Sequence, residues 1–239
     1  MPISKTDFIR GLQCEKMLWL DAHAPEHKII PPERQAKLDA GNEFGDTAMG
    51  IFGDFTETTA YREDGRLDFS AMLEKTKSLL ENGTNVICEA SFTWYGNFCA
   101  ADILKKEGNG YVLYEVKNTY SVRKEFIQDL GFQRLLLRKC GVPLLESKLI
   151  LRGDTPPEGY EIKDEKIDSE EKMKKNGFIY RIANVTSSAK RAEFLASQRI
   201  FELGKLKRKD APMPDILPDK QCDAPYRCWY YEYCHKLCE

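Results

Sequence analysis

The chain has 239 residues, of which 42% are hydrophobic and 31% charged, a composition that predicts one folded domain and excludes a disordered chain. The formal net charge of −2 argues against a protein that coats polyanions generally, but it allows a local basic groove. No run of about 18 apolar residues predicts a membrane span, and the start lacks a signal-peptide pattern. We therefore expect a cytoplasmic protein without membrane contact.

The first part of the chain predicts helices and then strands. A capping signal at Ser4 and apolar residues at helical spacing predict helices over residues 4–20, 33–52 and 68–83. Three segments rich in β-branched and aromatic residues follow, separated by turn residues, at 84–92, 97–106 and 110–118. They predict three consecutive antiparallel strands.

The second part predicts a helix over residues 123–141, a strand over 142–152, a polar surface excursion over 153–176, a short strand over 178–185 and a last helix over 186–209. The resulting order predicts an α/β domain with a mixed sheet (α+β in type) that spans residues 1–239. The C-terminal segment, residues 210–239, begins with a proline-marked connector over 210–219 and ends in a cysteine-rich tail over 222–239.

Three charged residues on neighbouring strands are the main candidates for chemistry. A two-residue turn at 108–109 would set Asp102 opposite Glu115. A turn at 109–110, which has the stronger type I′ signal because it is Asn-Gly, would set Asp102 opposite Lys117. Because Glu115 and Lys117 are two residues apart, both registers place the three side chains on one face. The opposite face is predicted to be apolar and consists of Ala101, Ile103, Tyr114 and Val116.

Two neighbouring carboxylates repel each other unless a cation lies between them. A divalent ion such as Mg²⁺, held by the carboxylates of Asp102 and Glu115 plus waters, removes this repulsion. The ammonium of Lys117 beside it would donate a proton or stabilise charge, and these groups together favour phosphodiester cleavage by an activated water. The alternative is an ordinary solvated strand face on which Lys117 forms a surface salt bridge.

The pair Asp102 and Glu115-Val116-Lys117 resembles the signature of the PD-(D/E)XK nuclease superfamily. The order of helix, three strands, helix and strand, over about residues 34–152, is similar to that superfamily's restriction-endonuclease-like core. The chain most resembles the RecB-like branch, which includes the iron-sulfur CRISPR-associated exonucleases and their bacterial relatives. The segments that carry this likeness are ISKTDFIRGLQCEKMLWL, AGNEFGDTA, EASF, AADIL, YEVKNT, DLGFQ and the cysteine tail.

The resemblance implies a Mg²⁺- or Mn²⁺-dependent deoxyribonuclease, by its relatives an exonuclease, acting on single-stranded DNA or free DNA ends. It implies that Lys117 is the catalytic lysine. The implied metal ligands are Glu43, Asp102, Glu115 and the carbonyl of Val116. Glu89 is either a further acidic group near the site or a simple strand carboxylate.

Gln133 is a candidate on two grounds. The resemblance matches it to a catalytic-site glutamine on the helix after the E-x-K strand. From the residues alone, it is a lone amide in the apolar stripe of Phe126, Leu130 and Leu137, so it should face the sheet and need a hydrogen-bonding partner. The alternative is a glutamine at the helix edge that reaches solvent.

Eight cysteines in a chain without an export signal favour metal or cluster ligation over disulfides. The resemblance implies a structural [4Fe-4S] cluster that joins the helix at 4–20 to the tail through Cys14, Cys222, Cys228 and Cys234, with Cys238 as an alternative ligand. A zinc site formed by the four tail cysteines is the rival interpretation. Two other functions also remain open: a catalytically silent nucleic-acid-binding subunit with a zinc or iron-sulfur site, and a cluster-based redox sensor.

Overall fold

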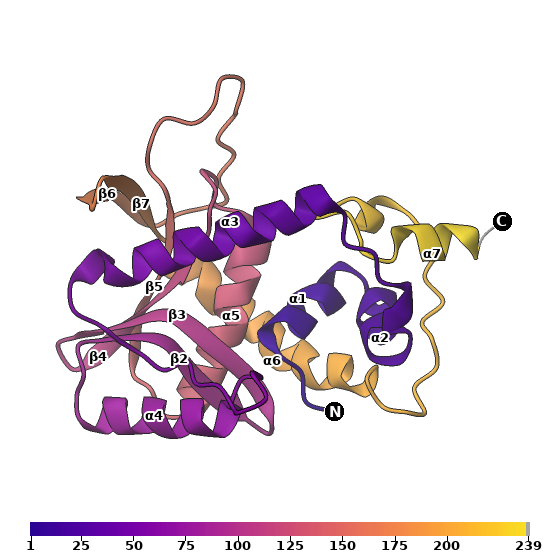
Figure 1. Cartoon of the computed structure of the whole chain (residues 1–239), viewed down its shortest axis with the longest axis horizontal. Coiled ribbons are helices and arrows are strands. Elements are labelled where there is room, and N and C mark those ends of the chain that lie inside the picture. Colours follow the sequence, from indigo (N-terminus) through magenta and orange to yellow (C-terminus); the bar gives the residue numbers. More distant parts are fainter. Residues whose placement is uncertain (238–239) are drawn as a thin grey trace.

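The computed structural model describes residues 1–237 and has a mixed α/β fold built on a seven-stranded sheet (Figure 1). The strand order is β1-β2-β3-β4-β5-β7-β6. The strands are β1 Thr56–Glu57, β2 Val86–Trp94, β3 Asn97–Glu107, β4 Gly110–Val116, β5 Leu144–Arg152, β6 Ser169–Lys175 and β7 Phe178–Asn184. The α-helices of the described part are α1 Lys5–Gln13, α2 Glu15–His23, α3 Pro32–Met49, α4 Phe69–Glu81, α5 Lys124–Lys139, α6 Thr186–Lys205 and α7 Tyr231–Lys236.

The centre of the sheet follows the predicted order. Strands β2, β3 and β4 pair in antiparallel fashion, as predicted. Strand β5 then pairs with β4 in parallel, which requires a crossover, and α5 supplies it. The antiparallel strands β7 and β6 extend the sheet beyond β5.

Helices cover both faces of the sheet. On one face, α3 crosses the strands and buries Phe44 and Ala48 against a cluster that includes Ile103 and Tyr114 (Figure 1). On the other face lies a larger cluster formed with α1, α5 and α6. Helix α5 lies at the centre of this arrangement, because all its residues from Asp129 to Leu137 are buried.

Helices α5 and α6 approach each other closely at Gly131. A Cβ atom at this position would lie 2.5 Å from the carbonyl carbon of Ala192 and 2.6 Å from its Cβ. Nearby, the buried Arg134 guanidinium donates to Glu193 on α6 at 3.0 Å and to Ser147 on β5 at 2.8 Å. Only a residue without a side chain allows α6 to lie this close to α5.

We therefore expect Gly131→Ala to lower the free energy of unfolding by about 2 to 3 kcal/mol, the usual cost of forcing extra volume into a packed core. Gly45→Ala is the matched control, because Gly45 is also inside a helix but, apart from its own helix backbone and chain neighbours, no described atom lies within 4 Å of the place that an added methyl group would take. There alanine should stabilise by up to about 1 kcal/mol. Urea unfolding measures both effects, and an unchanged midpoint for Gly131→Ala would contradict the close helix contact.

Two predictions of secondary structure are wrong in detail, and helix α7 lies in the tail, for which the sequence predicted no element. The helix predicted over residues 4–20 is two helices, because Cys14 has extended backbone (φ −160°, ψ 118°) and separates α1 from α2. The Cys14 N–H still donates to the Arg10 carbonyl, and the Cys14 carbonyl accepts from Met17 and Leu18, so this residue ends one helix and starts the next. The surface excursion contains strand β6.

The two ends of the described chain pack together. Met17 and Leu20 of α2 form a buried cluster with the tail residues Cys222, Cys228, Tyr230 and Cys234. The amide of Gln13 donates to the carbonyls of Gln221 and Tyr226, at 2.9 and 2.7 Å. Within the described residues, no helix combines the length and the apolar character needed to cross a bilayer.

Candidate active site

Strand pairing decides between the two predicted registers of the β3–β4 hairpin. Glu107 pairs with Gly110, and Ile103 pairs with Tyr114. The turn is therefore at residues 108–109, and the other register is wrong. Continuing this pairing by one residue places Asp102 opposite Glu115.

The hairpin brings the three predicted charged residues into one cluster. Asp102 Oδ2 accepts a hydrogen bond from the backbone N–H of Val116 at 2.7 Å, which fixes its carboxylate beside β4. Lys117 Nζ lies 2.5 Å from Glu115 Oε1. Asp102 and Lys117 keep 25% and 24% of their side chains exposed, whereas Glu115 keeps 1%, so the cluster is open to solvent on the Asp102 and Lys117 side.

Helix α5 adds two polar side chains to this cluster. Gln133 is fully buried and faces the sheet as predicted, and its Nε2 donates to Glu115 Oε2 at 2.6 Å. Asp129 Oδ2 accepts from Lys117 Nζ at 2.9 Å. The sequence-based reasoning assigned no role to Asp129, although it lies four residues before Gln133 and therefore on the same helix face.

Helix α1 adds a second lysine, which sequence reasoning also missed. Lys5 Nζ lies 3.0 and 3.2 Å from the two carboxylate oxygens of Glu115. It also lies 3.6 Å from Asp102 Oδ1 and 3.8 Å from Asp129 Oδ1. No local pattern could have indicated this contact, because Lys5 and Glu115 are 110 residues apart in the sequence.

These contacts fix the charges of the cluster. Burial alone would raise the pKa of Glu115, but the ammonium groups of Lys117 and Lys5 outweigh it and hold that pKa well below its usual range. Burial alone would lower the pKa of Lys117, but Asp129 and Glu115 outweigh it and raise that pKa. Burial and the Glu115 carboxylate together raise the pKa of Asp129 to about 6. Burial and the Glu115 carboxylate likewise raise the pKa of Asp102. Glu115, which both ammonium groups contact, is therefore the most acidic carboxylate of the cluster.

Glu89 on β2 lies at the edge of this cluster and has an unusual backbone. Its φ of 54° is in the left-handed region, which is costly for a residue with a side chain. The regular alternation of the sheet breaks here: Cys88 packs in the cluster under α3, but Ala90 packs in the cluster on the other face. Ala101, which pairs with Ala90, packs in the same cluster as Ala90, whereas Ile103 packs in the cluster under α3. The prediction that Ala101 shares a face with Ile103 is therefore wrong.

Burial and the Asp102 carboxylate raise the pKa of Glu89 from its ordinary 4.5 to about 7. At a pH between these two pKa values, Glu89 keeps its proton in the folded protein but has released it in the unfolded chain. The free energy of unfolding therefore falls as pH rises through this range. Glu89→Gln removes the titrating carboxyl group. The free energy of unfolding of the variant minus that of the natural protein should therefore increase from pH 5 to about 7 and then level off. Denaturant unfolding over this range, in protein freed of divalent cations, measures it; a difference independent of pH would contradict the assignment.

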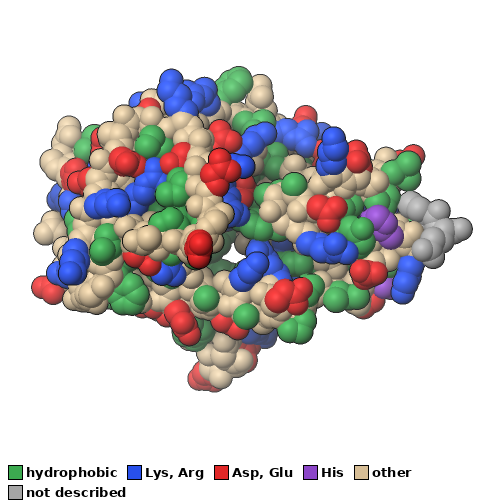
Figure 2. Space-filling view, turned by 90° about the horizontal axis from the view of Figure 1, so that it is seen from above, with side chains coloured by type: hydrophobic (Ala, Val, Ile, Leu, Met, Phe, Trp, Pro, Cys, Tyr) green, Lys and Arg blue, Asp and Glu red, His purple; other side chains and the backbone are tan. Residues whose placement is uncertain are grey.

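For two predicted metal ligands, the Glu43 side chain and the Val116 carbonyl, no described contact links them to the cluster. The Glu43 side chain is exposed on α3, and only its backbone carbonyl has a described hydrogen bond, from Thr47 Oγ1 at 2.8 Å. Helix α3 is anchored nearby, because Asn118 Nδ2 donates to the Ala40 carbonyl at 2.9 Å. The ligand roles of Glu43 and of the Val116 carbonyl stay predictions. Seen from above, the molecule is hollowed near its middle, with acidic and basic side chains around the hollow (Figure 2).

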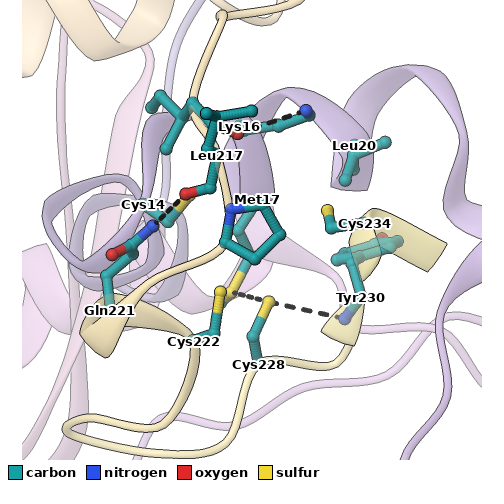
Figure 3. Close-up of a pocket in the computed structure, with 12 residues that line it drawn as sticks. Cys14, Lys16, Met17, Leu20, Leu217, Gln221, Cys222, Cys228, Tyr230 and Cys234 are labelled. Atoms are coloured by element: carbon teal, nitrogen blue, oxygen red, sulfur yellow. Dashed lines mark hydrogen bonds between the residues drawn. The ribbon is translucent and has the colours of Figure 1, made fainter. Parts of the chain in front are cut away.

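A second candidate site lies where the chain ends meet. Cys14, Cys222, Cys228 and Cys234 line one small cavity, arranged around Met17 (Figure 3). Cys14 comes from the break between α1 and α2, and the other three come from the tail. Sequence spacing alone left the ligand set open, and Cys238, the alternative ligand, lies outside the described residues.

The cysteine cavity is apolar. Burial raises the pKa of the Cys228 thiol to about 12 and also raises the pKa of Cys14. These thiols are therefore protonated at neutral pH, and metal binding would release their protons. Cys228 Sγ lies 3.5 Å from Met17 Sδ. Within residues 1–237, no group of three or more His, Cys, Asp or Glu side chains has its atoms placed to hold a metal ion as they stand.

Comparison with known protein families gave no matching family model, and no curated protein matches the chain.

Proposed function

We propose that the protein is a Mg²⁺- or Mn²⁺-dependent nuclease that hydrolyses phosphodiester bonds in DNA, acting on single strands or free ends. The observation that supports this function best is the convergence of Asp102, Glu115, Lys117 and Gln133. These residues come from two strands and a crossover helix, and they meet in one cluster that is partly open to solvent. A solvated strand face would not bury Glu115 or give it three nitrogen partners.

The cluster has the chemistry of a divalent-cation site. Carboxylate oxygens are the ligands that Mg²⁺ and Mn²⁺ prefer, and Asp102, Glu115 and Asp129 already surround a cation, the ammonium of Lys5. Gln133 Oε1 is buried and has no hydrogen-bond partner within the described residues, so it can accept from a bound water. Asp102 and Glu115 would hold the ion, with Glu43 and the Val116 carbonyl as further ligands.

A bound divalent ion would supply a Lewis acid and lower the pKa of a water molecule beside the phosphate. The residues of the chain have separate tasks. Lys117, held by Glu115 and Asp129, presents a fixed ammonium that stabilises negative charge developing on the phosphate. Gln133 holds the Glu115 carboxylate by its second oxygen, and the Val116 N–H holds Asp102. These hydrogen bonds keep both carboxylates in place before substrate arrives.

The fold also supports the proposal. Helix α3, and after β1 and α4 the strands β2 to β4, helix α5 and strand β5, occur in the order of a restriction-endonuclease-like core. The resemblance of AADIL, YEVKNT and DLGFQ to the PD-(D/E)XK superfamily covers the strands and the helix that carry Asp102, Glu115, Lys117, Asp129 and Gln133. Assignment to that superfamily's RecB-like branch is part of the proposal.

We further propose that Cys14, Cys222, Cys228 and Cys234 hold a [4Fe-4S] cluster, with zinc as the alternative. The cavity that these residues share supports this ligand set over one formed by the tail alone, because Cys14 belongs to it. A cluster there would join α1 and α2 to the tail. Its role is structural.

A gel assay tests the proposed activity. Protein prepared without oxygen is incubated with end-labelled single-stranded DNA, double-stranded DNA and RNA of one sequence, with Mn²⁺ or with a chelator. The expected result is that DNA is degraded with Mn²⁺ and stays intact with the chelator. DNA binding without degradation in any condition would instead support a catalytically silent binding subunit.

A further inference from the structure

Lys5 is a cation inside the carboxylate cluster that the proposed reaction does not use. Its ammonium lies within 4 Å of the carboxylates of Glu115, Asp102 and Asp129, at 3.0, 3.6 and 3.8 Å. Lys117 touches two of these carboxylates, Glu115 and Asp129, from the β4 end. Lys5 is therefore the ammonium that lies between Asp102 and Glu115, the two carboxylates proposed to share the metal ion.

The backbone of Lys5 is firmly held. Ser4 caps α1, because its Oγ accepts from the Asp7 N–H at 3.1 Å while Asp7 accepts from the Ser4 N–H at 2.9 Å. Phe8 is fully buried, with its ring centroid 5.0 Å from that of Phe132 on α5. Asp7 also accepts from Lys207 at 2.7 Å. Helix α1 therefore delivers the Lys5 ammonium to the cluster, and only the flexible side chain can move away.

We propose that Lys5 is a tethered counter-ion that competes with the divalent cation for the carboxylates and so sets the metal concentration the site requires. This inference rests on the proposed function, because it needs a divalent ion at Asp102 and Glu115. An ammonium that donates to both oxygens of Glu115 uses the lone pairs that a metal ion would take. A divalent ion bound between Asp102 and Glu115 would lie where the Lys5 ammonium now lies and would repel it, so the metal ion must displace Lys5.

The tether has a second consequence. Without Lys5 and without metal, Lys117 would be the one ammonium left among the described contacts of Asp102, Glu115 and Asp129. Buried carboxylates with too little compensating charge are costly. Lys5 removes most of this cost and keeps the carboxylates grouped. It therefore stabilises the metal-free protein and weakens metal binding through the same contacts.

Mn²⁺ binding to the whole chain without DNA tests the competition, measured by isothermal titration calorimetry or by the signal of free Mn²⁺. Lys5→Met removes the charge but keeps an unbranched side chain, and its Kd for Mn²⁺ should be about tenfold lower or more. Lys5→Arg keeps the charge and should bind within about threefold of the natural protein. Lys207→Met is the matched control, because it removes a positive charge that contacts α1 through Asp7 and not the cluster.

Lys5→Gln is a second neutral variant whose amide can still donate to Glu115, and it should also bind Mn²⁺ more tightly. If Lys5→Met does not fold without metal, its unfolding temperature over a series of Mn²⁺ concentrations gives the same comparison. Unchanged or weaker Mn²⁺ binding in the neutral variants overturns the proposal, as does equal tightening in Lys207→Met. If the neutral variants bind Mn²⁺ more tightly but the natural protein does not cleave DNA, the Lys5 proposal stands and the proposed nuclease activity is contradicted. If the natural protein cleaves DNA but the neutral variants bind Mn²⁺ no more tightly, the nuclease activity stands and the Lys5 proposal is contradicted.

Discussion

Lys117→Met should lower the rate of Mn²⁺-dependent DNA cleavage by about a thousandfold, the size of loss that follows removal of one preorganised charge-stabilising group. Lys117 is held within 3 Å of Glu115 and Asp129, at 2.5 and 2.9 Å, so its ammonium has a fixed position in the cluster. The rate is measured on end-labelled DNA at saturating Mn²⁺. Saturation ensures that a change in metal affinity does not affect the comparison.

Lys105→Met is the matched control for this variant. Lys105 lies on the neighbouring strand β3 and forms the same kind of pair, 2.6 Å from Glu107 two residues away. It lies outside the cluster, so its removal should leave the rate within about twofold of the natural protein. Circular dichroism shows whether both variants are folded. A folded Lys117→Met protein that cleaves at the natural rate would contradict the role of Lys117.

Cys228→Ser should abolish metal binding at the cysteine cavity and lower the unfolding temperature by about 10 °C or more. The cavity joins α1 and α2 to the tail, so the metal's binding free energy also holds these segments together. Iron, sulfide and zinc contents of protein prepared without oxygen provide the first readout. A brown natural protein indicates the iron-sulfur cluster, and a colourless one that contains zinc indicates the alternative.

Cys140→Ser is the control, because Cys140 is exposed at the end of α5, away from the cysteine cavity, and its thiol donates to the Thr93 carbonyl at 3.3 Å. Its metal content should equal that of the natural protein, and its unfolding temperature should change by less than about 2 °C. A Cys228→Ser protein that retains the full metal content would show that the cavity is not a metal centre.

Local patterns were sufficient to predict the centre of the fold. Alternating residues predict the β3–β4 hairpin, although they left two turn positions open and only the strand pairing selects residues 108–109. The spacing along α5 places Gln133 toward the sheet. These features depend on residues close together in the sequence, where the period of the secondary structure decides which side chains share a face. Asp129 could have been found in the same way.

The rest depends on contacts between distant segments. Lys5 reaches Glu115 across 110 residues, and nothing near Lys5 marks it as part of a polar cluster. The break at Cys14 interrupts a continuous apolar pattern, because packing of α2 against the tail overrides the local preference for one long helix. The exposed strand β6 carries no apolar alternation, since five of its seven residues, SEEKMKK, are charged, and pairing with β7 makes it a strand.

The most direct test of the proposed chemistry compares the natural protein with Glu115→Gln on end-labelled single-stranded DNA, each with Mn²⁺ and with a chelator. Glu115→Gln keeps the shape of the side chain that Lys5, Lys117 and Gln133 contact but removes the charge that would hold the metal ion. The proposed mechanism predicts labelled fragments only from the natural protein with Mn²⁺. Equal cleavage by folded Glu115→Gln, or intact DNA in all four reactions, would contradict it.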